Sequence, residues 1–229
     1  MYLKRKADAY LNAWKSDPNR SPLIIKGPRQ VGKTETIDYF AAHNYRSVVE
    51  INFVEEPKYR AITADGYGAN TIVRNISLID PAKKFIPGDT LIFFDEIQAH
   101  PDIATALKFF KIDGKYDVIC SGSMLGISYK QIESNSVGYK TDYEMRSLDF
   151  EEFLWARGYD EAVIESMFTH LCDATPFSEV EMNVFSTAFM DYCVLGGMPA
   201  VVASHIRTGT FEGTLQLQRQ LILDYQEDI

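Results

Sequence analysis

The octet GPRQVGKT at residues 27–34 limits most strongly what this chain can fold into. It follows the apolar run Leu23–Ile25 and precedes a stretch with helical character, residues 34–42. The octet satisfies the pattern G-x-x-x-x-G-K-[ST], in which glycines let the backbone turn so that successive N–H groups face phosphate oxygens. The N-terminus of the following helix adds its positive end. The strand, the loop and the helix together predict a nucleotide phosphate-binding loop.

Within this loop, individual residue types predict individual roles. We expect Lys33 to reach the β- and γ-phosphates of a nucleoside triphosphate, and the Thr34 hydroxyl to bind Mg²⁺. Arg29 has two equal interpretations: a contact with phosphate or a neighbouring subunit, and an exposed loop arginine. The residues predicted to bind the nucleotide are Gly27, Pro28, Arg29, Gln30, Val31, Gly32, Lys33, Thr34 and Glu35.

A second element supports the first, because the apolar run 91–94 ends in the pair Asp95-Glu96. A buried strand delivers such acids to the edge of a sheet, where the metal of a P-loop site lies. We predict that Asp95 holds Mg²⁺, usually through water, and that Glu96 polarises the attacking water as a general base. Adjacent carboxylates favour ATP hydrolysis. The alternative, an acidic pair that caps the next helix, weighs more for Glu96 than for Asp95.

A third element is the run 118–123, which ends in small polar residues. In one branch of P-loop proteins, an extra strand between the two strands above presents a polar side chain to the γ-phosphate or the water. Ser123 is the first candidate for this sensor and Ser121 the second, and the alternative for each is a serine in an ordinary turn. Asn52 is either a hydrogen-bond partner of Glu96 or an ordinary strand-end asparagine. The predicted catalytic residues are Glu96, Lys33 and Ser123.

Four apolar segments predict the strands of one sheet, at residues 22–26, 48–53, 90–95 and 116–121. They alternate with helical stretches, which favours an α/β fold of three layers, αβα, around a mainly parallel sheet. A helix is expected before them, at about residues 5–16. Beyond about residue 150 the pattern becomes helical, with helix starts at Asp149 and Ser178. We therefore predict a P-loop core over residues 1–150 and a small helical domain over residues 151–229.

Composition argues against several classes of function. The formal net charge is −9, from 23 basic and 32 acidic residues, which argues against binding to nucleic acid through overall charge. The run Lys4–Lys6 together with Lys15 is the candidate basic patch, and a solvated helix face is its favoured interpretation. Three widely spaced cysteines fit neither a disulfide framework nor a zinc site. Because no apolar stretch approaches about 20 residues, we predict a cytoplasmic protein without a membrane partner.

Five segments occur in a fixed order: GPRQVGKT, FFDEIQAHP, LKFFKIDGKYDVICSGSMLGISY, SVGYKTDYEMRSLDFEEFLWARG and YCVLGGMPAVV. Together they resemble the prokaryotic AAA-superfamily ATPases in which a P-loop domain and a small helical lid precede a further, poorly characterised C-terminal domain. Gln30 in the loop and Gln98 after the acidic pair are typical of that family. The resemblance implies an AAA-type core that binds ATP and Mg²⁺, and a helical lid. It also implies that a C-terminal domain begins at LILDYQEDI, residues 221–229.

The chain departs from that family at one place that bears on mechanism. Many relatives carry a Gly-Arg pair before the LSFxEF segment, whereas this chain has Gly138-Tyr139-Lys140. An arginine finger is therefore not carried over, and action of the nearby Arg146 in trans is the weaker interpretation. A homo-oligomer and a nucleic-acid partner are implied by family analogy only.

These observations predict Mg-dependent ATP binding and hydrolysis in a molecular switch or motor. One alternative is a regulatory module that holds ATP or ADP with little turnover. Another is a P-loop small-molecule kinase, against which the pair Asp95-Glu96 and the sensor-like serines count.

Overall fold

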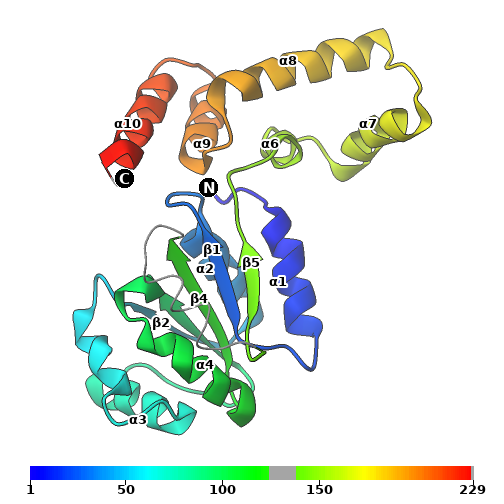
Figure 1. The fold of residues 1–229 in the computed structure, drawn as a ribbon. Coiled ribbons are helices and arrows are strands. Elements are labelled where there is room, and N and C mark those ends of the chain that lie inside the picture. Colours follow the sequence, from blue (N-terminus) through cyan, green and yellow to red (C-terminus); the bar gives the residue numbers. More distant parts are fainter. Residues whose placement is uncertain (124–137, 228–229) are drawn as a thin grey trace. The chain divides into compact units, whose positions relative to one another are not determined.

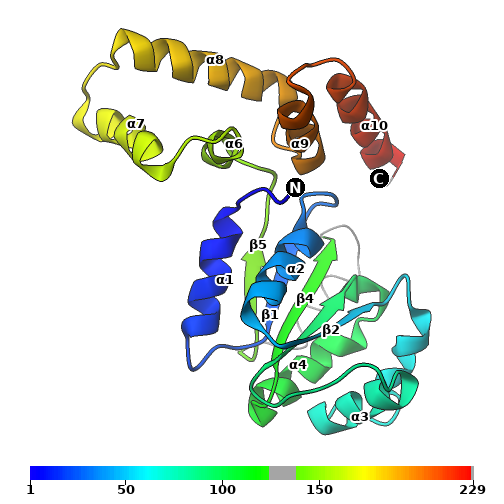
Figure 2. The same cartoon turned by 180° about the vertical axis from the view of Figure 1, so that it is seen from behind.

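The computed structural model describes residues 1–123 and 138–227. Parts of three segments quoted above lie outside these ranges: residues 124–129, 136–137 and 228–229. Contacts divide the chain into two compact units, a core unit (Ala7–Met145) and a helical unit (Met1–Lys6 with Arg146–Ile229). Figures 1 and 2 show both units from opposite sides.

The core unit contains a sheet of five parallel strands in the order β2-β3-β4-β1-β5. The strands are β1 (Leu23–Gly27), β2 (Ser47–Asn52), β3 (Thr90–Asp95), β4 (Asp117–Ser123) and β5 (Thr141–Glu144). The helices around them are α1 (Lys6–Ser16), α2 (Lys33–Asn44), α3 (Ala69–Ile79) and α4 (Asp102–Asp113), with two 3₁₀ turns, η1 (Pro57–Thr63) and η2 (Ile97–Ala99). Helices α1 and α2 cover one face of the sheet, and α3 and α4 cover the other (Figures 1 and 2).

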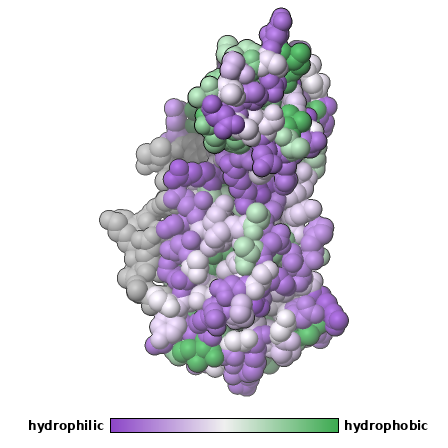
Figure 3. Space-filling view, turned by 90° about the vertical axis from the view of Figure 1, so that its right-hand side faces the viewer, coloured by the Kyte–Doolittle hydropathy of each residue, from purple (hydrophilic) through white to green (hydrophobic). Residues whose placement is uncertain are grey.

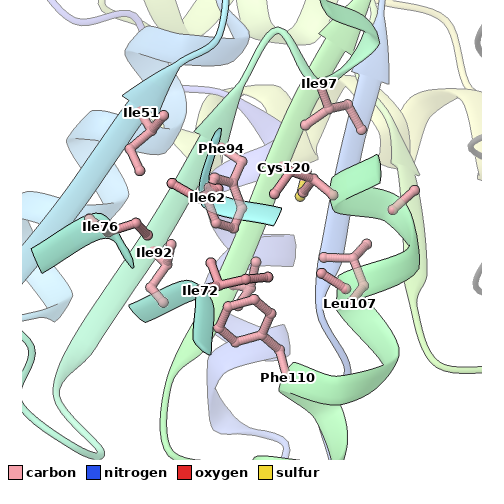
Figure 4. Packing of buried hydrophobic residues seen from close by; sticks show 14 of the residues in the cluster. Ile51, Ile62, Ile72, Ile76, Ile92, Phe94, Ile97, Leu107, Phe110 and Cys120 are labelled. Carbon is pink, nitrogen blue, oxygen red and sulfur yellow. The ribbon is translucent and has the colours of Figure 1, made fainter. Parts of the chain in front are cut away.

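Successive side chains of a strand point to opposite faces of the sheet, and in this sheet helices cover both faces. In β3, Ile92 and Phe94 pack in the cluster with α3 and α4, whereas Leu91 and Phe93 pack in the cluster with α1 and α2. Figure 4 shows the first cluster, in which Phe94 lies beside the side chains of the helices on that face. A strand that is buried on both faces is continuously apolar, as the sequence of β3 is. The predicted three-layer α/β fold is confirmed.

Strand β4 lies between β3 and β1, the position predicted for the strand that carries the serines. Strand β5 was not predicted from the sequence. Its residues Thr141, Asp142, Tyr143 and Glu144 contain no apolar run, and their burial alternates between half-buried and exposed. Because β5 forms an edge of the sheet and pairs on one side with β1, its polar residues remain compatible with a strand.

The helical unit contains α6 (Phe150–Ala156), α7 (Glu161–Asp173), α8 (Glu179–Leu195), α9 (Pro199–Thr208) and α10 (Thr214–Glu227). Asp149 and Ser178 both form capping boxes, so the two predicted helix starts are confirmed. The sequence analysis did not separate α7 and α9 as helices of their own. Within the described ranges, none of the helices combines the length and the apolar composition that crossing a bilayer requires.

The surfaces of the two units differ. On the face shown in Figure 3, hydrophilic residues cover most of the core unit, and hydrophobic residues gather in several patches on the helical unit. Helix α8 contributes many of the exposed apolar side chains: Val180, Met182, Val184, Phe189, Met190 and Val194.

The first residues of the chain anchor the helical unit. Arg5 is 5% exposed, its Nε donates to Glu152 Oε1 at 3.2 Å, and its Nη2 donates to the Arg146 carbonyl oxygen at 2.6 Å. The Lys6 backbone N–H donates to the same Glu152 oxygen at 2.7 Å. Arg5 is therefore a buried structural charge, and a solvated helix face is the wrong interpretation for it.

The two flanking lysines also face acids of the helical unit. Lys4 pairs with Glu161, and the Lys6 ammonium lies 2.5 Å from Asp149 Oδ2. The whole basic run is thus engaged within its own unit, which leaves it poorly suited to bind the phosphates of a nucleic acid.

Candidate functional site

A cavity of about 470 Å³ lies at the carboxyl ends of β1, β2 and β3, within the core unit. This is the edge of a parallel sheet at which ligands of open α/β folds bind. The loop after β1 and the start of α2 form one wall, and residues that follow β2 and β3 form the other. The lining residues are Arg29, Gln30, Gly32, Lys33, Thr34, Glu35, Asn52, Val54, Glu55 and Glu96.

The phosphate loop has two residues in the left-handed region, Gln30 (φ 60°) and Gly32 (φ 88°). Gly27 is needed for a different reason, since a Cβ there would lie 2.1 Å from the Met145 carbonyl oxygen. The Met145 N–H donates to the Lys26 oxygen at 2.7 Å, which holds that carbonyl against the loop. The first glycine of the octet therefore serves the approach of a neighbouring segment, which its place in the motif did not indicate.

Lys33 begins α2 and is only 7% exposed. Its Nζ donates to the carbonyl oxygens of Gly27 at 3.0 Å and Pro28 at 2.7 Å, so the ammonium spans the start of the loop. Burial lowers the pKa of Lys33, and the nearby carboxylates of Glu96 and Asp95 offset part of this effect. The arrangement places a desolvated cation at the wall of the cavity.

The carboxylate of Asp95 joins three elements of the core unit. Its Oδ2 accepts from Thr34 Oγ1 and from Asn52 Nδ2, both at 3.2 Å, and its Oδ1 accepts from the Ser121 hydroxyl. The Glu96 N–H also donates to Oδ1, at 3.0 Å. The hydroxyl of Thr34 and a carboxylate oxygen of Asp95 therefore lie side by side, and oxygen ligands of this kind suit Mg²⁺.

Glu96 lines the cavity with its backbone in the left-handed region, at φ 54° and ψ 48°. A non-glycine residue rarely adopts this conformation, and such outliers concentrate at functional sites. The side chain of Gln98, two residues further on, donates through Nε2 to Glu96 Oε2. The Asn52 amide bonds to Asp95 in this structure, and the hydrogen bond to Glu96 that the sequence suggested for Asn52 is absent from the described contacts.

The two serines at the end of β4 are both buried. Ser123 pairs in register with Gly27 at the start of the phosphate loop, and Ser121 reaches Asp95. The second candidate serine therefore has a defined contact with the predicted metal ligand, whereas Ser123 is placed beside the loop by the sheet.

Further carboxylates surround the Asp95 side of the cavity. Burial raises the pKa of Asp38 on α2, and the charges of Asp95 and Glu35 add to this effect. Burial likewise raises the pKa of Glu50 on β2, with contributions from Asp38 and Asp95. Burial is the main cause of both shifts, and the carboxylate of Asp95 contributes to each of them.

The structure brings most of the predicted site residues together around one cavity. Gly27, Pro28, Asp95 and Ser123 are not among its lining residues. Gly27 and Pro28 bond to Lys33, Asp95 bonds to Thr34, and Ser123 pairs with Gly27. The Val31 side chain is buried in the hydrophobic cluster with α1 and α2. Sequence reasoning missed Val54 and Glu55 in the lining. Their position just after the predicted second strand was the available signal.

The parallel sheet, the loop between β1 and α2, and the two acids at the end of β3 define a nucleotide-binding P-loop ATPase domain. A sequence model of the family described as "AAA domain" matches residues 19–154, and the chain belongs to this family. A comparison with curated proteins found no match.

The solved structures that resemble the chain include the following two. PCH-2 from C. elegans is similar with 11% identity and a TM-score of 0.39, over 77% of this chain and 50% of that one. The ORC1 protein from Aeropyrum pernix, solved in complex with DNA, is similar with 13% identity and a TM-score of 0.42, over 67% of this chain and 48% of that one. The chain is thus matched to about half of each of these proteins.

Proposed function

We propose that this chain binds ATP with Mg²⁺ and hydrolyses it, and that the hydrolysis drives a molecular switch or motor. The observation that carries the proposal is the convergence of Lys33, Thr34, Asp95 and Glu96 at one cavity. This reaction needs an ammonium group that binds phosphate, two oxygen ligands that bind a cation, and a carboxylate that activates water.

The residues present fit the nucleotide and the metal. The left-handed turn at Gln30 and Gly32 shapes the loop, and Lys33 already extends across its start toward neutral carbonyls. Thr34 and Asp95 would hold Mg²⁺, the charge of which would neutralise phosphate oxygens and stabilise the leaving group.

For hydrolysis, we propose that Glu96 acts as the general base. Its carboxylate accepts a proton from water, the water oxygen attacks the γ-phosphorus, and the bond to the β–γ bridging oxygen breaks to give ADP and phosphate. Ser123, beside Gly27, is the proposed sensor of the γ-phosphate. Lys33 stabilises charge on the transferred group.

The ligand proposal is restricted to nucleotide. The run Lys4–Lys6 is engaged with acids of the helical unit, and the net charge is −9, so neither observation supports a nucleic-acid partner. A homo-oligomer is proposed by analogy with the family only.

Binding and steady-state turnover of ATP, with Mg²⁺, test this proposal. We expect Lys33→Ala to weaken ATP binding by about 10- to 100-fold, the loss of a charge-assisted hydrogen bond. We expect Glu96→Gln to retain binding and to lower kcat by about 100-fold or more. If Glu96→Gln leaves kcat unchanged while Lys33→Ala abolishes binding, the chain is a regulatory module that holds nucleotide. ATP consumption that requires an added acceptor would instead indicate a kinase.

A further inference from the structure

The amide of Gln98 lies between the Glu96 carboxylate and the end of β4. The 3₁₀ turn η2 places it there: the Ala99 N–H donates to the Glu96 carbonyl oxygen at 2.9 Å, and the turn brings the two side chains together. Gln98 Nε2 then donates to Glu96 Oε2. Contact with the proposed general base therefore comes from a residue that is not itself part of the cavity lining.

The chemistry of the pair fixes the orientation of the amide. A carboxylate accepts hydrogen bonds and donates none, so the NH₂ group of Gln98 must face Glu96. Its Oε1 consequently points the other way, where it is buried and has no hydrogen-bond partner within residues 1–123 and 138–227. A buried carbonyl without a partner costs free energy, and such a group in a folded protein requires an explanation.

The end of β4 leaves space for this amide. A Cβ at Gly122 would lie 2.9 Å from Gln98 Oε1 and 3.3 Å from Ile97 Cγ1. Gly122 stands between Ser121, which reaches Asp95, and Ser123, which pairs with Gly27. The glycine therefore lets the Gln98 side chain occupy a position where any larger residue would displace it.

We propose that Gln98 is a positioning residue for the hydrolytic reaction, and that Gly122 provides the space it needs. By holding Glu96 Oε2, the Gln98 amide fixes the rotamer of a flexible side chain and leaves the other carboxylate oxygen for water. The unpaired Oε1 is the consequence of this orientation, and Glu96 carries its carboxylate on a backbone in the left-handed region. The inference rests on the proposed role of Glu96 as general base.

The first experiment compares Gln98→Leu, Glu96→Gln and the double variant by steady-state kinetics with Mg-ATP. Gln98→Leu keeps the size of the side chain and removes its donor, and we expect kcat to fall about 10- to 100-fold with KM changed less than about twofold. Because Gln98 acts through Glu96, we expect the double variant to be no slower than Glu96→Gln alone.

The outcomes separate this inference from the proposed function. If Glu96→Gln leaves kcat unchanged, the proposed function fails. If Glu96→Gln lowers kcat but Gln98→Leu does not, or if the two losses multiply in the double variant, only the inference is overturned. Gln220→Leu is the matched control, because Gln220 Nε2 also donates to a carboxylate, Asp224 Oδ1 at 2.8 Å, at an exposed position of α10 in the other unit. It should retain the parental kcat.

A second test keeps Gln98 and Glu96 intact and changes the space around them. Gly122→Ala places a methyl group against Gln98 Oε1, and we expect kcat to fall severalfold while KM is retained. In a Gln98→Ala background the amide is gone, so Gly122→Ala should cause no further loss. An equal loss in both backgrounds would overturn the proposal, since the methyl group would then act independently of Gln98.

Discussion

Among the described residues, one cation in each unit is buried as a whole residue, and these two cations have opposite surroundings. Arg5 in the helical unit faces the Glu152 carboxylate and the Arg146 carbonyl oxygen. Lys33 in the core unit is almost as buried, yet its direct contacts are the neutral carbonyl oxygens of Gly27 and Pro28.

This difference distinguishes a charge that stabilises the fold from a charge that is available to bind a ligand. A guanidinium paired with a buried carboxylate is satisfied within the protein, and removal of either partner leaves the other uncompensated. An ammonium beside a cavity, held by weaker acceptors, can exchange them for phosphate oxygens. The helical unit needs such an anchor because its apolar side chains are divided between two small clusters and an exposed surface.

The largest expected effect is the decrease in stability of the helical unit when the ion pair of Arg5 with Glu152 is lost. We expect Arg5→Ala to lower the free energy of unfolding of this unit by about 3–5 kcal/mol, because Glu152 would remain buried without its partner. The two tryptophans allow the units to be followed separately, since Trp14 lies in the core unit and Trp155 in the helical unit. In a Trp14→Phe background, denaturation followed by Trp155 fluorescence should shift to lower denaturant. An unchanged transition would show that Arg5 does not stabilise the unit.

The next effect concerns two glycines that face backbone carbonyls, one in each unit. A Cβ at Gly27 would lie 2.1 Å from the Met145 oxygen, and a Cβ at Gly197 would lie 2.0 Å from the Leu148 oxygen. We expect alanine at either position to cost about 1–3 kcal/mol or more, because the backbone must shift. The fluorescence of Trp14 should report the loss of stability caused by Gly27→Ala. The fluorescence of Trp155 should report the loss caused by Gly197→Ala. Gly68→Ala is the control, since its Cβ would meet only ordinary van der Waals contact.

A smaller effect is the pH dependence of ATP binding. Burial lowers the pKa of Lys33, so the ammonium loses its proton at a lower pH than an ordinary lysine. Only the protonated form binds phosphate well, and affinity should therefore fall as pH rises through the lowered value, by about tenfold. Titration calorimetry across alkaline pH measures this decline. Lys33→Arg remains charged throughout, and a decline of the same size in that variant would assign the effect to another group.

The smallest effect belongs to the exposed pair at the same anchor. Lys4 and Glu161 have side chains that are 52% and 71% exposed, so solvent screens their attraction. We expect Lys4→Ala to change the stability of the helical unit by less than about 1 kcal/mol. A loss as large as that of Arg5→Ala, measured by Trp155 fluorescence, would contradict the distinction between buried and exposed cations.

The sequence was informative where a residue's role depends on its neighbours in the chain. The loop between β1 and α2, the acids after β3 and the capping boxes are local patterns, and the structure has each of these elements where the sequence predicted it. The αβα layers followed because strands that are buried on both faces must be apolar throughout.

Features that depend on contacts between residues far apart in the sequence could not be predicted. Strand β5 has no apolar run and exists because β1 offers it an edge. The contact of Gly27 with Met145 and the ion pair of Arg5 with Glu152 join residues more than a hundred positions apart. The catalytic role of Glu96 and the sensor role of Ser123 are predictions that the kinetic experiments above test.

The grouping of residues 1–6 with residues 146–229 also bears on how the protein is made. Arg5 leaves the ribosome early, but Glu152 follows 147 positions later, after every strand of the sheet has been synthesised. At bacterial and eukaryotic elongation speeds this interval lasts roughly 7–30 s. The core unit, an uninterrupted stretch of chain, is complete before the helical unit can receive its anchor. Nascent chains should therefore acquire a protease-resistant core first, before the segment that pairs with residues 1–6 has been translated.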